Sequence, residues 1–452
     1  MSAPAPPQPT RATVTTIRAD GSRQFLYPAD VRGRFSRARR LVAGLFIALY
    51  LSLPWIRIGG YPAVFLDVAH RRFHLLGRVF AAQDLWLIFF LISGVGFGLF
   101  FVTAMLGRIW CGWACPQTVF LDHVYRRWER WLDGDGVQRR ELAAAPWSAG
   151  KVGRRAAKHA GYLLISAVLT HLFLAYYVSL PVVWSLVRAA PGAHWSIFVF
   201  IALATGALYF NFAWFREQLC IVICPYGRLQ SVLTDEHTLT IGYDTARGDC
   251  IDCLRCVRVC PTGIDIRQGL QMECIGCAAC VDACDEVMDR LARPRGLVRY
   301  DSLAGLGGQP TRWIRPRVWL YAGLLAAGAT AAALAFASVR PAVLSVSRMI
   351  GAPYYFDRDS VRNQILVRLI NKRPDPVRFT LTVSGLPPGF VVGGNDRPLE
   401  LAPLQEDVRL LVISEPRAHF ASGAVLVIGA DDDRGDRLAR PISFLGPGTA
   451  LP

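Results

Sequence analysis

Residues 250–284 read CIDCLRCVRVCPTGIDIRQGLQMECIGCAACVDAC, and they hold eight cysteines in two copies of one pattern, C-x2-C-x2-C-x3-C. Soft thiolates at this spacing bind a cubane of iron and sulfide. Three thiolates of a copy come from one tight turn, and the fourth binds the other cubane. The two copies therefore predict two 4Fe-4S clusters.

The exchange of the fourth thiolate between the copies predicts the ligands of each cluster. The first cluster is expected to use Cys250, Cys253, Cys256 and Cys284, and the second Cys274, Cys277, Cys280 and Cys260. Zinc is the alternative, but a zinc site of four thiolates takes no third cysteine at this spacing, and the motif is doubled. Pro261 follows the first copy, as is typical of ferredoxins, whereas Asp285 stands where the second proline would be and removes no ligand.

The composition of the whole chain is typical of a membrane protein. Of its 452 residues, 53% are hydrophobic, and the mean hydropathy is +0.31, too apolar for an ordinary soluble protein. The formal charge is +16, but the arginines crowd beside apolar stretches and no basic module interleaved with aromatic residues is present. The arginines are therefore predicted to set the orientation of the apolar stretches in the membrane and to lie next to lipid. No nucleic-acid partner is expected.

Five apolar stretches are predicted to cross the membrane as helices, which need about 20 residues each. They are residues 41–56, 85–106, 160–187, 195–215 and 318–339, the third of which contains Pro181. Arginines precede the first stretch, and residues 108–158 carry ten Lys and Arg against five acids, so both regions are expected in the cytoplasm. The expected location is the inner membrane of a bacterium. An odd number of spans then places the C-terminus in the periplasm.

The spans and the cysteine segment divide the chain into five predicted regions. A flexible, basic cytoplasmic start covers residues 1–40, a four-helix membrane region 41–215, a cytoplasmic two-cluster ferredoxin-like domain 216–317, a fifth transmembrane helix 318–339, and a periplasmic domain 340–452. The fold class is thus an α-helical polytopic membrane protein with a ferredoxin-like insert and a C-terminal all-β domain.

The C-terminal domain is predicted to be an immunoglobulin-like antiparallel sandwich. Its apolar residues alternate in short runs separated by Pro, Gly, Asn and Asp, as in strands that bury one face. The expected strands are residues 361–370, 377–383, 408–413, 424–428 and 441–444. The domain contains no cysteine, so no disulfide is expected in it.

The remaining four cysteines form a second matched set, each pair in a C-x3-C-P motif. Cys111 and Cys115 lie in WCGWACPQ, and Cys220 and Cys224 lie in LCIVICPYG. Each motif follows the second span of a hairpin, which indicates a parallel internal repeat. If the segment stays helical up to the proline, the cysteines of a pair share one face, and two such faces offer four thiolates. Buried small residues are one interpretation, while a redox-active dithiol or a catalytic site for a soft metal such as copper fits the matched pattern better.

These motifs, together with QFLYPADVRGRF at residues 24–35, resemble the accessory proteins of cbb-type cytochrome c oxidase known as CcoG, RdxA or FixG. The resemblance covers nearly the whole chain, and an aspartate at the position of Asp285 is itself a feature of that family. It implies reduction of Cu(II) to the Cu(I) that copper chaperones and oxidase assembly factors accept. No G-x-G-x-x-G fingerprint opens a strand-to-helix turn here, so the expected cytoplasmic electron donor is another protein or a diffusible reductant.

Two other functions remain open from the sequence. The chain could be an electron-transfer subunit that serves a quinol or other membrane redox complex, since such subunits resemble its hairpins and their C-x3-C-P motifs. It could also be a non-catalytic scaffold for oxidase assembly, in which the clusters only stabilise the fold or sense redox state. Copper dependence of cluster reoxidation distinguishes these functions from a cupric reductase.

Overall fold

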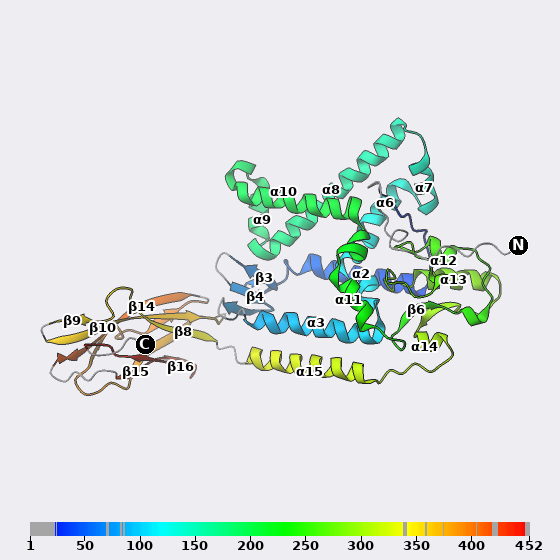
Figure 1. The fold of residues 1–452 in the computed structure, drawn as a ribbon. Coiled ribbons are helices and arrows are strands. Elements are labelled where there is room, and N and C mark those ends of the chain that lie inside the picture. Colours follow the sequence, from blue (N-terminus) through cyan, green and yellow to red (C-terminus); the bar gives the residue numbers. More distant parts are fainter. Residues whose placement is uncertain are drawn as a thin grey trace. The chain divides into compact units, whose positions relative to one another are not determined.

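The structure is a computed structural model that describes residues 23, 25–68, 72–81, 84, 86–337, 341–357, 359–373, 375–403, 405–417 and 424–447. The chain divides into two compact units, each built from two separate stretches. The first contains Met1–Ile56 and Trp86–Ala333, and the second contains Arg57–Leu85 and Leu334–Pro452. Figure 1 shows that helices dominate the first unit and strands the second.

Among the described residues, four helical stretches are long and apolar enough to cross a membrane. They are Trp86–Leu106, Ala149–Val178, Pro191–Phe215 and Pro316–Ala337, with mean hydropathies of 2.3, 1.6, 1.8 and 1.7. In Figure 1 they correspond to α3 (Trp86–Leu106), α8 (Ala149–Val178), the stretch around α10 (Trp195–Phe210) and α15 (Pro316–Ala337). Four of the five predicted spans therefore have matching helices.

The predicted first span, residues 41–56, lies on α2 (Arg34–Ser52), which is not one of these four. The first half of α2 contains four arginines, so its apolar half is shorter than the roughly 20 residues that cross a bilayer core. Large apolar side chains are nevertheless exposed along that half: Leu41 at 73%, Leu45 at 65% and Leu49 at 48%. The fifth span stays a prediction.

The predicted third span, residues 160–187, is two helices. The helix α8 ends where Ser179 adopts a left-handed φ of 63°, and α9 (Leu180–Arg188) then begins with Pro181 in its first turn. Proline is tolerated there because its missing N–H would have no helical acceptor. The sequence located the interruption correctly, but the membrane-length helix ends at this break and does not continue past it.

The helices α3 and α10 are each followed by the same succession of short elements. After α3 come α4 (Ile109–Trp113) and α5 (Pro116–Phe120). After α10, which ends in a π-helical turn, come a second π-helical turn (Leu219–Ile223) and α11 (Pro225–Leu233). In both places a short helical turn stops and a new helix begins at a proline, as the predicted internal repeat requires. The chain from α5 to α8 then adds α6 (Arg126–Asp133) and α7 (Gly136–Ala144).

The cysteine-rich segment folds into a small domain around two short helices and one antiparallel pair of strands. Each triple of cysteines leads into a helix, α12 (Arg255–Arg258) or α13 (Ala279–Arg290). The strands β6 (Thr240–Tyr243) and β7 (Val298–Asp301) pair antiparallel on either side of the segment, and α14 (Leu303–Leu306) follows. This is the ferredoxin-like insert that the spacing predicts.

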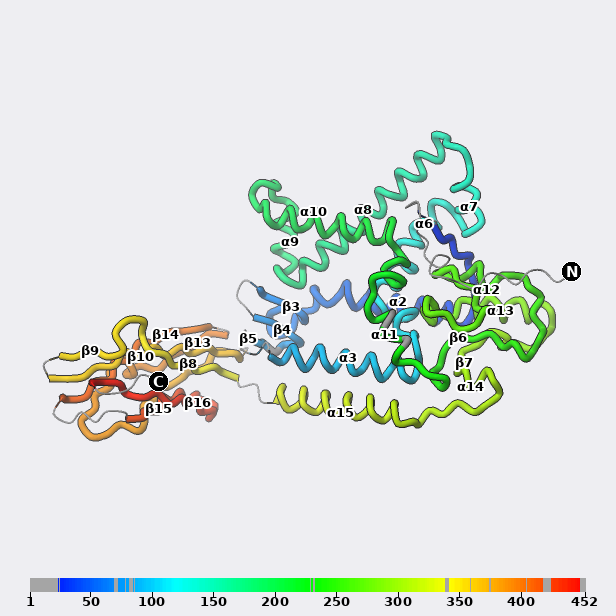
Figure 2. Tube along the Cα trace, in the orientation of Figure 1, coloured from blue at the N-terminus to red at the C-terminus, as the bar shows by residue number. Residues whose placement is uncertain are grey.

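The segment before α2 is bound to this cysteine-rich domain. The amide of Ala29 donates to the carbonyl of Arg258 at 2.8 Å, and the carboxylate of Asp282 accepts from the amides of Phe35 and Ser36 at 3.2 and 2.6 Å. Figure 2 shows the start of α2 beside α13. The sequence predicts a flexible start over residues 1–40, whereas residues 25–40 have these fixed contacts. The earlier part of that range, apart from Arg23, lies outside the described residues.

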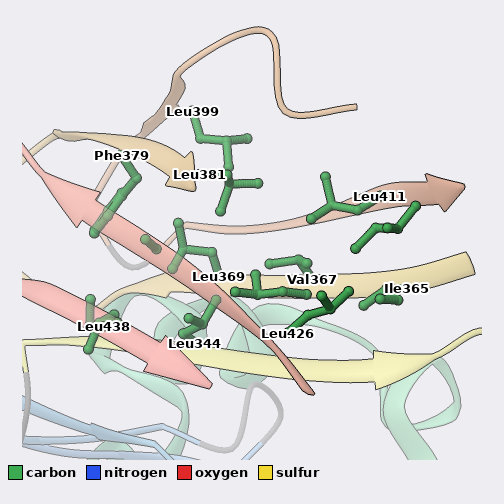
Figure 3. Packing of buried hydrophobic residues seen from close by; sticks show 14 of the residues in the cluster. Leu344, Ile365, Val367, Leu369, Phe379, Leu381, Leu399, Leu411, Leu426 and Leu438 are labelled. Carbon is green, nitrogen blue, oxygen red and sulfur yellow. The ribbon is translucent and has the colours of Figure 1, made fainter. Parts of the chain in front are cut away.

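The second unit is a sandwich of two antiparallel sheets. One has the order β12-β14-β10-β8, with β9 also on β10, and the other has the order β13-β11-β15-β16. The strands are β8 (Ala342–Arg348), β9 (Tyr355–Phe356), β10 (Ser360–Asn371), β11 (Val377–Ser384), β12 (Val391–Gly393), β13 (Leu399–Leu401), β14 (Glu406–Pro416), β15 (Val425–Asp432) and β16 (Arg437–Ser443). The alternate apolar residues of both sheets meet in one core, where Figure 3 shows Val367 and Leu411 with Phe379. The five predicted strands are confirmed.

Residues 57–81 add strands to the second unit that the sequence did not predict. A first pair joins β1 (Arg57–Ile58) to β2 (Tyr61–Pro62), and β3 (Val64–Asp67), β4 (Arg72–Leu75) and β5 (Arg78–Ala81) form a small sheet. Lys372 forms an ion pair with Asp84, and the rings of Phe80 and Phe336 meet edge to face at 5.4 Å. Strands of two to four residues are too short to show a hydrophobic period, which explains the missed prediction.

Candidate metal centres

The eight cysteines of residues 250–284 line two neighbouring cavities in the exchanged pattern. Cys250, Cys253, Cys256 and Cys284 line one, and Cys260, Cys274, Cys277 and Cys280 line the other, with Cys256 bordering both. Isoleucines 241, 264, 266 and 275 form apolar walls around the second cavity. Across the described chain, no three His, Cys, Asp or Glu side chains converge closely enough to hold a single metal ion. Thiols spread around an apolar cavity fit a cubane.

The two cysteine loops share a backbone conformation that turns the sulfurs inward. In each copy the middle cysteine lies between two residues of positive φ: Asp252 and Leu254 in the first, Gly276 and Ala278 in the second. Their φ values are 53° and 56°, then 66° and 58°. This left-handed region is unfavourable for Leu and Ala, so the surrounding structure must hold it. The short spacing x2 between cysteines already required such tight turns.

Burial disfavours the thiolate form of these cysteines unless a cation lies beside them. It raises the pKa of Cys256 and of Cys274 to about 12, and the pKa of Cys284 to about 11. Burial also raises the pKa of Cys277, although the guanidinium of Arg39 opposes this shift. Iron would supply the positive charge that ligating thiolates need.

Asp285, at the position of the expected proline, has its own structural role. Its side chain is buried, and Oδ1 accepts a hydrogen bond from the amide of Gly296 at 3.1 Å. This bond closes the loop that returns from α13 to β7. The carbonyl of Pro261, in the first copy, instead accepts from Nη2 of Arg126 at 3.3 Å.

The two C-x3-C-P motifs have the same geometry, but neither stays helical up to its proline. Cys115 has φ −60° and ψ 126°, and Cys224 has φ −60° and ψ 111°, which is extended backbone in both. The condition for a pair to share one helix face, a helix that continues to the proline, is therefore not met in either motif. A proline disfavours helical conformation in the preceding residue, and the second cysteine of each motif is that residue.

The four cysteines of these motifs still gather in one place. The pKa of Cys220 is raised to about 12, chiefly by burial and then by the neighbouring thiols of Cys115, Cys111 and Cys224, while Arg108 opposes the shift. Burial also raises the pKa of Cys111, which Arg108 and Gln230 oppose. Nε2 of Gln230 lies 3.5 Å from the Cys111 sulfur. The structure thus makes both predicted pairs neighbours, and it adds Arg108 and Gln230, which sequence reasoning missed although Arg108 lies three residues before Cys111.

The first C-x3-C-P motif packs directly against the loop that holds Cys274, Cys277 and Cys280. We call these three residues, with Cys260, the second cysteine set. A Cβ atom on Gly112 would lie 2.5 Å from the carbonyl oxygen of Ile275 and 2.9 Å from the amide nitrogen of Cys277. Nε1 of Trp113 donates to the carbonyl of Gly276 at 3.2 Å. Cys111 belongs to the same apolar cluster as Ile275 and Cys277. Only a glycine lets the two backbones approach this closely.

Arg39, on α2, contacts the first C-x3-C-P motif and Asp122. It is buried, its Nε donates to the carbonyl of Gly112 at 2.9 Å, and its Nη2 donates to Asp122 Oδ2 at 2.9 Å. The sequence counted Arg39 only as one of the basic residues that set topology. Its position in a run of exposed arginines gave no signal of this buried contact.

Replacing Gly112 by alanine is expected to destabilise the first unit by about 1–3 kcal/mol, because the added methyl must push two backbones apart. The measurement is thermal unfolding of the purified protein in detergent. Gly153→Ala is the matched control, since its Cβ would meet nothing within 4 Å inside α8 and should be neutral or stabilising. Equal unfolding temperatures for the two variants would contradict the close packing.

Comparison with known proteins agrees with these centres. A 4Fe-4S dicluster domain model matches residues 215–249 and 245–303, and a 4Fe-4S binding domain model matches residues 86–135. A model described as an IG-like fold at the C-terminal of FixG matches residues 332–447. Iron–sulfur chemistry and the C-terminal fold thus have independent support.

The full-length relatives extend the match to most of the chain. Protein RdxA of Cereibacter sphaeroides is 37% identical over 80% of this chain and 82% of its own length. Nitrogen fixation protein FixG of Rhizobium meliloti is 33% identical over 97% and 96%. Ferredoxin-type protein NapH of Haemophilus influenzae is 28% identical over 52% of this chain and 78% of its own. The chain therefore belongs to the FixG/RdxA family of iron–sulfur electron-transfer proteins.

Proposed function

We propose that the protein is a membrane-bound reductase that converts Cu(II) to Cu(I) at the thiols of Cys111, Cys115, Cys220 and Cys224. The packing of Cys111–Trp113 against Ile275–Cys277 carries this proposal, because it puts Cys111 in contact with the loop of the second cysteine set. No three of the four thiols converge on one point among the described residues, so copper binding would have to draw them together. The Cu(I) would pass to copper chaperones and assembly factors of a cbb-type cytochrome c oxidase, as the resemblance of the motifs implies.

The reaction adds one electron to the copper ion and breaks no covalent bond. Thiolates favour Cu(I) over Cu(II), because Cu(I) is the softer ion. Arg108 opposes the effect of burial on the Cys111 pKa, which favours the metal-binding thiolate. Bound 4Fe-4S clusters supply single electrons, and their reduction requires a cytoplasmic donor. The residues that would hold them are the two cysteine sets that line the two cavities.

The proposed topology has five spans, with α2 as the first. Residues 29–36 contact the cysteine-rich domain, so both lie on one side of the membrane. Three crossings, α3, α8 and α10, separate them along the chain. An odd number would put them on opposite sides, so a fourth crossing is needed before Trp86. The exposed apolar half of α2 is the segment available for it. The arginine bias then places the domain in the cytoplasm.

Reporter fusions test this topology. Alkaline phosphatase fused after Pro452 is expected to be active, because five spans place that end in the periplasm. The same enzyme fused within residues 133–150 is expected to be inactive, and a fluorescent protein fused there should be bright. Phosphatase activity at the internal site, or its absence at the C-terminus, would remove α2 from the set of spans.

A second candidate function is an electron-transfer subunit for a quinol or other membrane redox complex. The observation in its favour is the 4Fe-4S binding domain match over residues 86–135, where the cysteines are Cys111 and Cys115. On this alternative the four gathered thiols hold iron instead of copper. The similarity to NapH, a ferredoxin-type protein, points the same way.

Stopped-flow oxidation of the reduced, purified protein distinguishes the candidates. For a cupric reductase, Cu(II) reoxidises the clusters rapidly, and a Cu(I)-specific chelator detects one Cu(I) per electron. For a subunit of a quinol system, a quinone analogue reoxidises them and Cu(II) does not. Failure of both oxidants would leave the scaffold function. Electron paramagnetic resonance of the reduced and oxidised states reports the clusters in each case.

A further inference from the structure

A cavity of about 560 Å³ lies within the first unit, beside the loop of the second cysteine set. Its walls come from the segment before α2, the start of α2, the stretch from Asp122 to Arg139, and Val259, Pro261 and Ala279. Eight arginines line it, against two carboxylates, Asp30 and Asp122. The volume is in the range of ligand pockets, roughly 300–1,000 Å³. We call it the arginine cavity.

The two carboxylates of the arginine cavity already have partners. Asp122 accepts from Arg39 at 2.9 Å and from Arg126 at 2.6 Å, and Asp30 pairs with Arg130 at 2.6 Å. Three other arginines of the lining, Arg37, Arg40 and Arg127, form no ion pair within the described part of the chain. Nε of Arg37 and of Arg40 reach only the carbonyls of Gly33 and Ser36. The lining therefore has a surplus of positive charge.

The surplus charge acts in a partly desolvated place. The pKa of His123 is lowered to about 4, chiefly by burial; Asp122 opposes this shift, and Arg39, Arg127 and Arg40 add to it. Burial, Arg130 and Arg40 lower the pKa of Arg127. Arg126 is only 8% exposed, and its Nε has no hydrogen-bond partner among the described residues. The Nη atoms of Arg126 pair with Asp122 and Glu217, whereas its Nε and the guanidinium groups of Arg37, Arg40 and Arg127 have no carboxylate partner among the described residues.

We propose that the arginine cavity binds a phosphate-bearing anion. Planar guanidinium groups match phosphate oxygens through paired N–H donors, and a bound anion would offset their mutual repulsion. The volume admits more than one phosphate group. The diphosphate of a soluble nucleotide and the head group of an anionic phospholipid share this chemistry. The proposal does not depend on copper as the substrate.

In the arginine cavity, a ligand would be separated by the side chain of Arg39 from the first C-x3-C-P motif and the loop of the second cysteine set. Arg39 lines the cavity, donates to the carbonyl of Gly112, and opposes the raised pKa of Cys277. Val259 and Ala279 line the cavity and also pack in the apolar cluster that contains Cys111 and Cys277. Binding would therefore fix the position of Arg39 at the contact between the C-x3-C-P motif and the second cysteine set.

The test uses the full-length protein with its clusters, delipidated in a nonionic detergent, and inorganic pyrophosphate as the probe in calorimetry. The variant Arg37→Gln/Arg40→Gln/Arg127→Gln removes arginines that are exposed and form no described ion pair, so folding should persist. Its affinity for pyrophosphate is expected to fall by about 30-fold or more, since each charged hydrogen bond contributes up to about tenfold. The control Arg34→Gln/Arg154→Gln/Arg290→Gln loses the same charge outside the lining and should change affinity less than about threefold.

Two further arms identify the source of the phosphate. Phosphorus analysis of the protein before delipidation and competition by cardiolipin would indicate a lipid head group, whereas competition by a dinucleotide such as flavin adenine dinucleotide would indicate a soluble ligand. No pyrophosphate binding to the wild-type protein at millimolar concentration would overturn the proposal. Equal weakening in the two triple variants, with unchanged cluster spectra, would reduce it to unspecific attraction by net charge.

Discussion

Serine at positions 111 and 115, or at 220 and 224, is expected to abolish Cu(II) reduction while both iron–sulfur spectra persist. The thiols of Cys111, Cys115 and Cys224 all raise the pKa of Cys220, so the two pairs are neighbours although they come from separate hairpins, and the proposal treats them as one donor set. Serine keeps the size of the side chain and loses the soft donor that binds Cu(I). The eight cysteines that line the two cavities are unchanged in these variants.

A chelator assay for Cu(I) measures the loss, and iron content with visible spectra checks the clusters. If the pairs form one site, either double variant should lose about as much activity as the fourfold variant, because residues that act as a unit are not additive. Two half-active double variants would indicate separate sites. Full copper reduction by the fourfold variant would make these cysteines structural. A fall in iron with each double variant would instead favour a third cluster at the gathered thiols.

The iron–sulfur sets could be predicted because their geometry is local. The spacing x2 forces a tight turn around each middle cysteine. In the structure, this turn gives Leu254 and Ala278 a positive φ. The same loop lengths assign Cys260 to the cluster of the second copy and Cys284 to the cluster of the first. Alternation along β10 and β14 likewise revealed the sandwich, since every second side chain of these strands enters the core.

The geometry of the C-x3-C-P motifs was missed for a local reason that the sequence did contain. A helix through Cys115 conflicts with Pro116, and the same conflict recurs at Cys224 and Pro225. The matched spacing drew attention to residues four apart, as on one helix face. The proline after the second cysteine was the better guide.

The contact between the two kinds of cysteine site has no local signal. Gly112 and Cys277 are far apart in the sequence, and a lone glycine in an aromatic stretch does not indicate which backbone it approaches. Arg39 was likewise hidden in a basic run that topology already explained. Such contacts depend on how helices pack, which periodicity does not encode.

Cys253→Ser is expected to remove the first cluster and to weaken the second. The unaltered protein should contain about eight iron and eight sulfide ions per chain, as two cubanes require. Cys253 is the middle cysteine of its turn, held between the left-handed residues Asp252 and Leu254, and serine there offers a poor ligand to iron.

The second cluster should weaken with the first because the two sets are interleaved. Cys284 belongs to the first cavity but lies on α13, the helix that also carries Cys280 of the second. Loss of the first cubane frees Cys284 and the loop before α12, so iron is expected to fall to about four per chain or below. Iron analysis and electron paramagnetic resonance measure this loss. Ile251→Val, a change in the same loop at a side chain 45% exposed, should keep all the iron. Retention of both cubanes in Cys253→Ser would show that Cys253 is not a ligand and would overturn the ligand assignment of the first cluster.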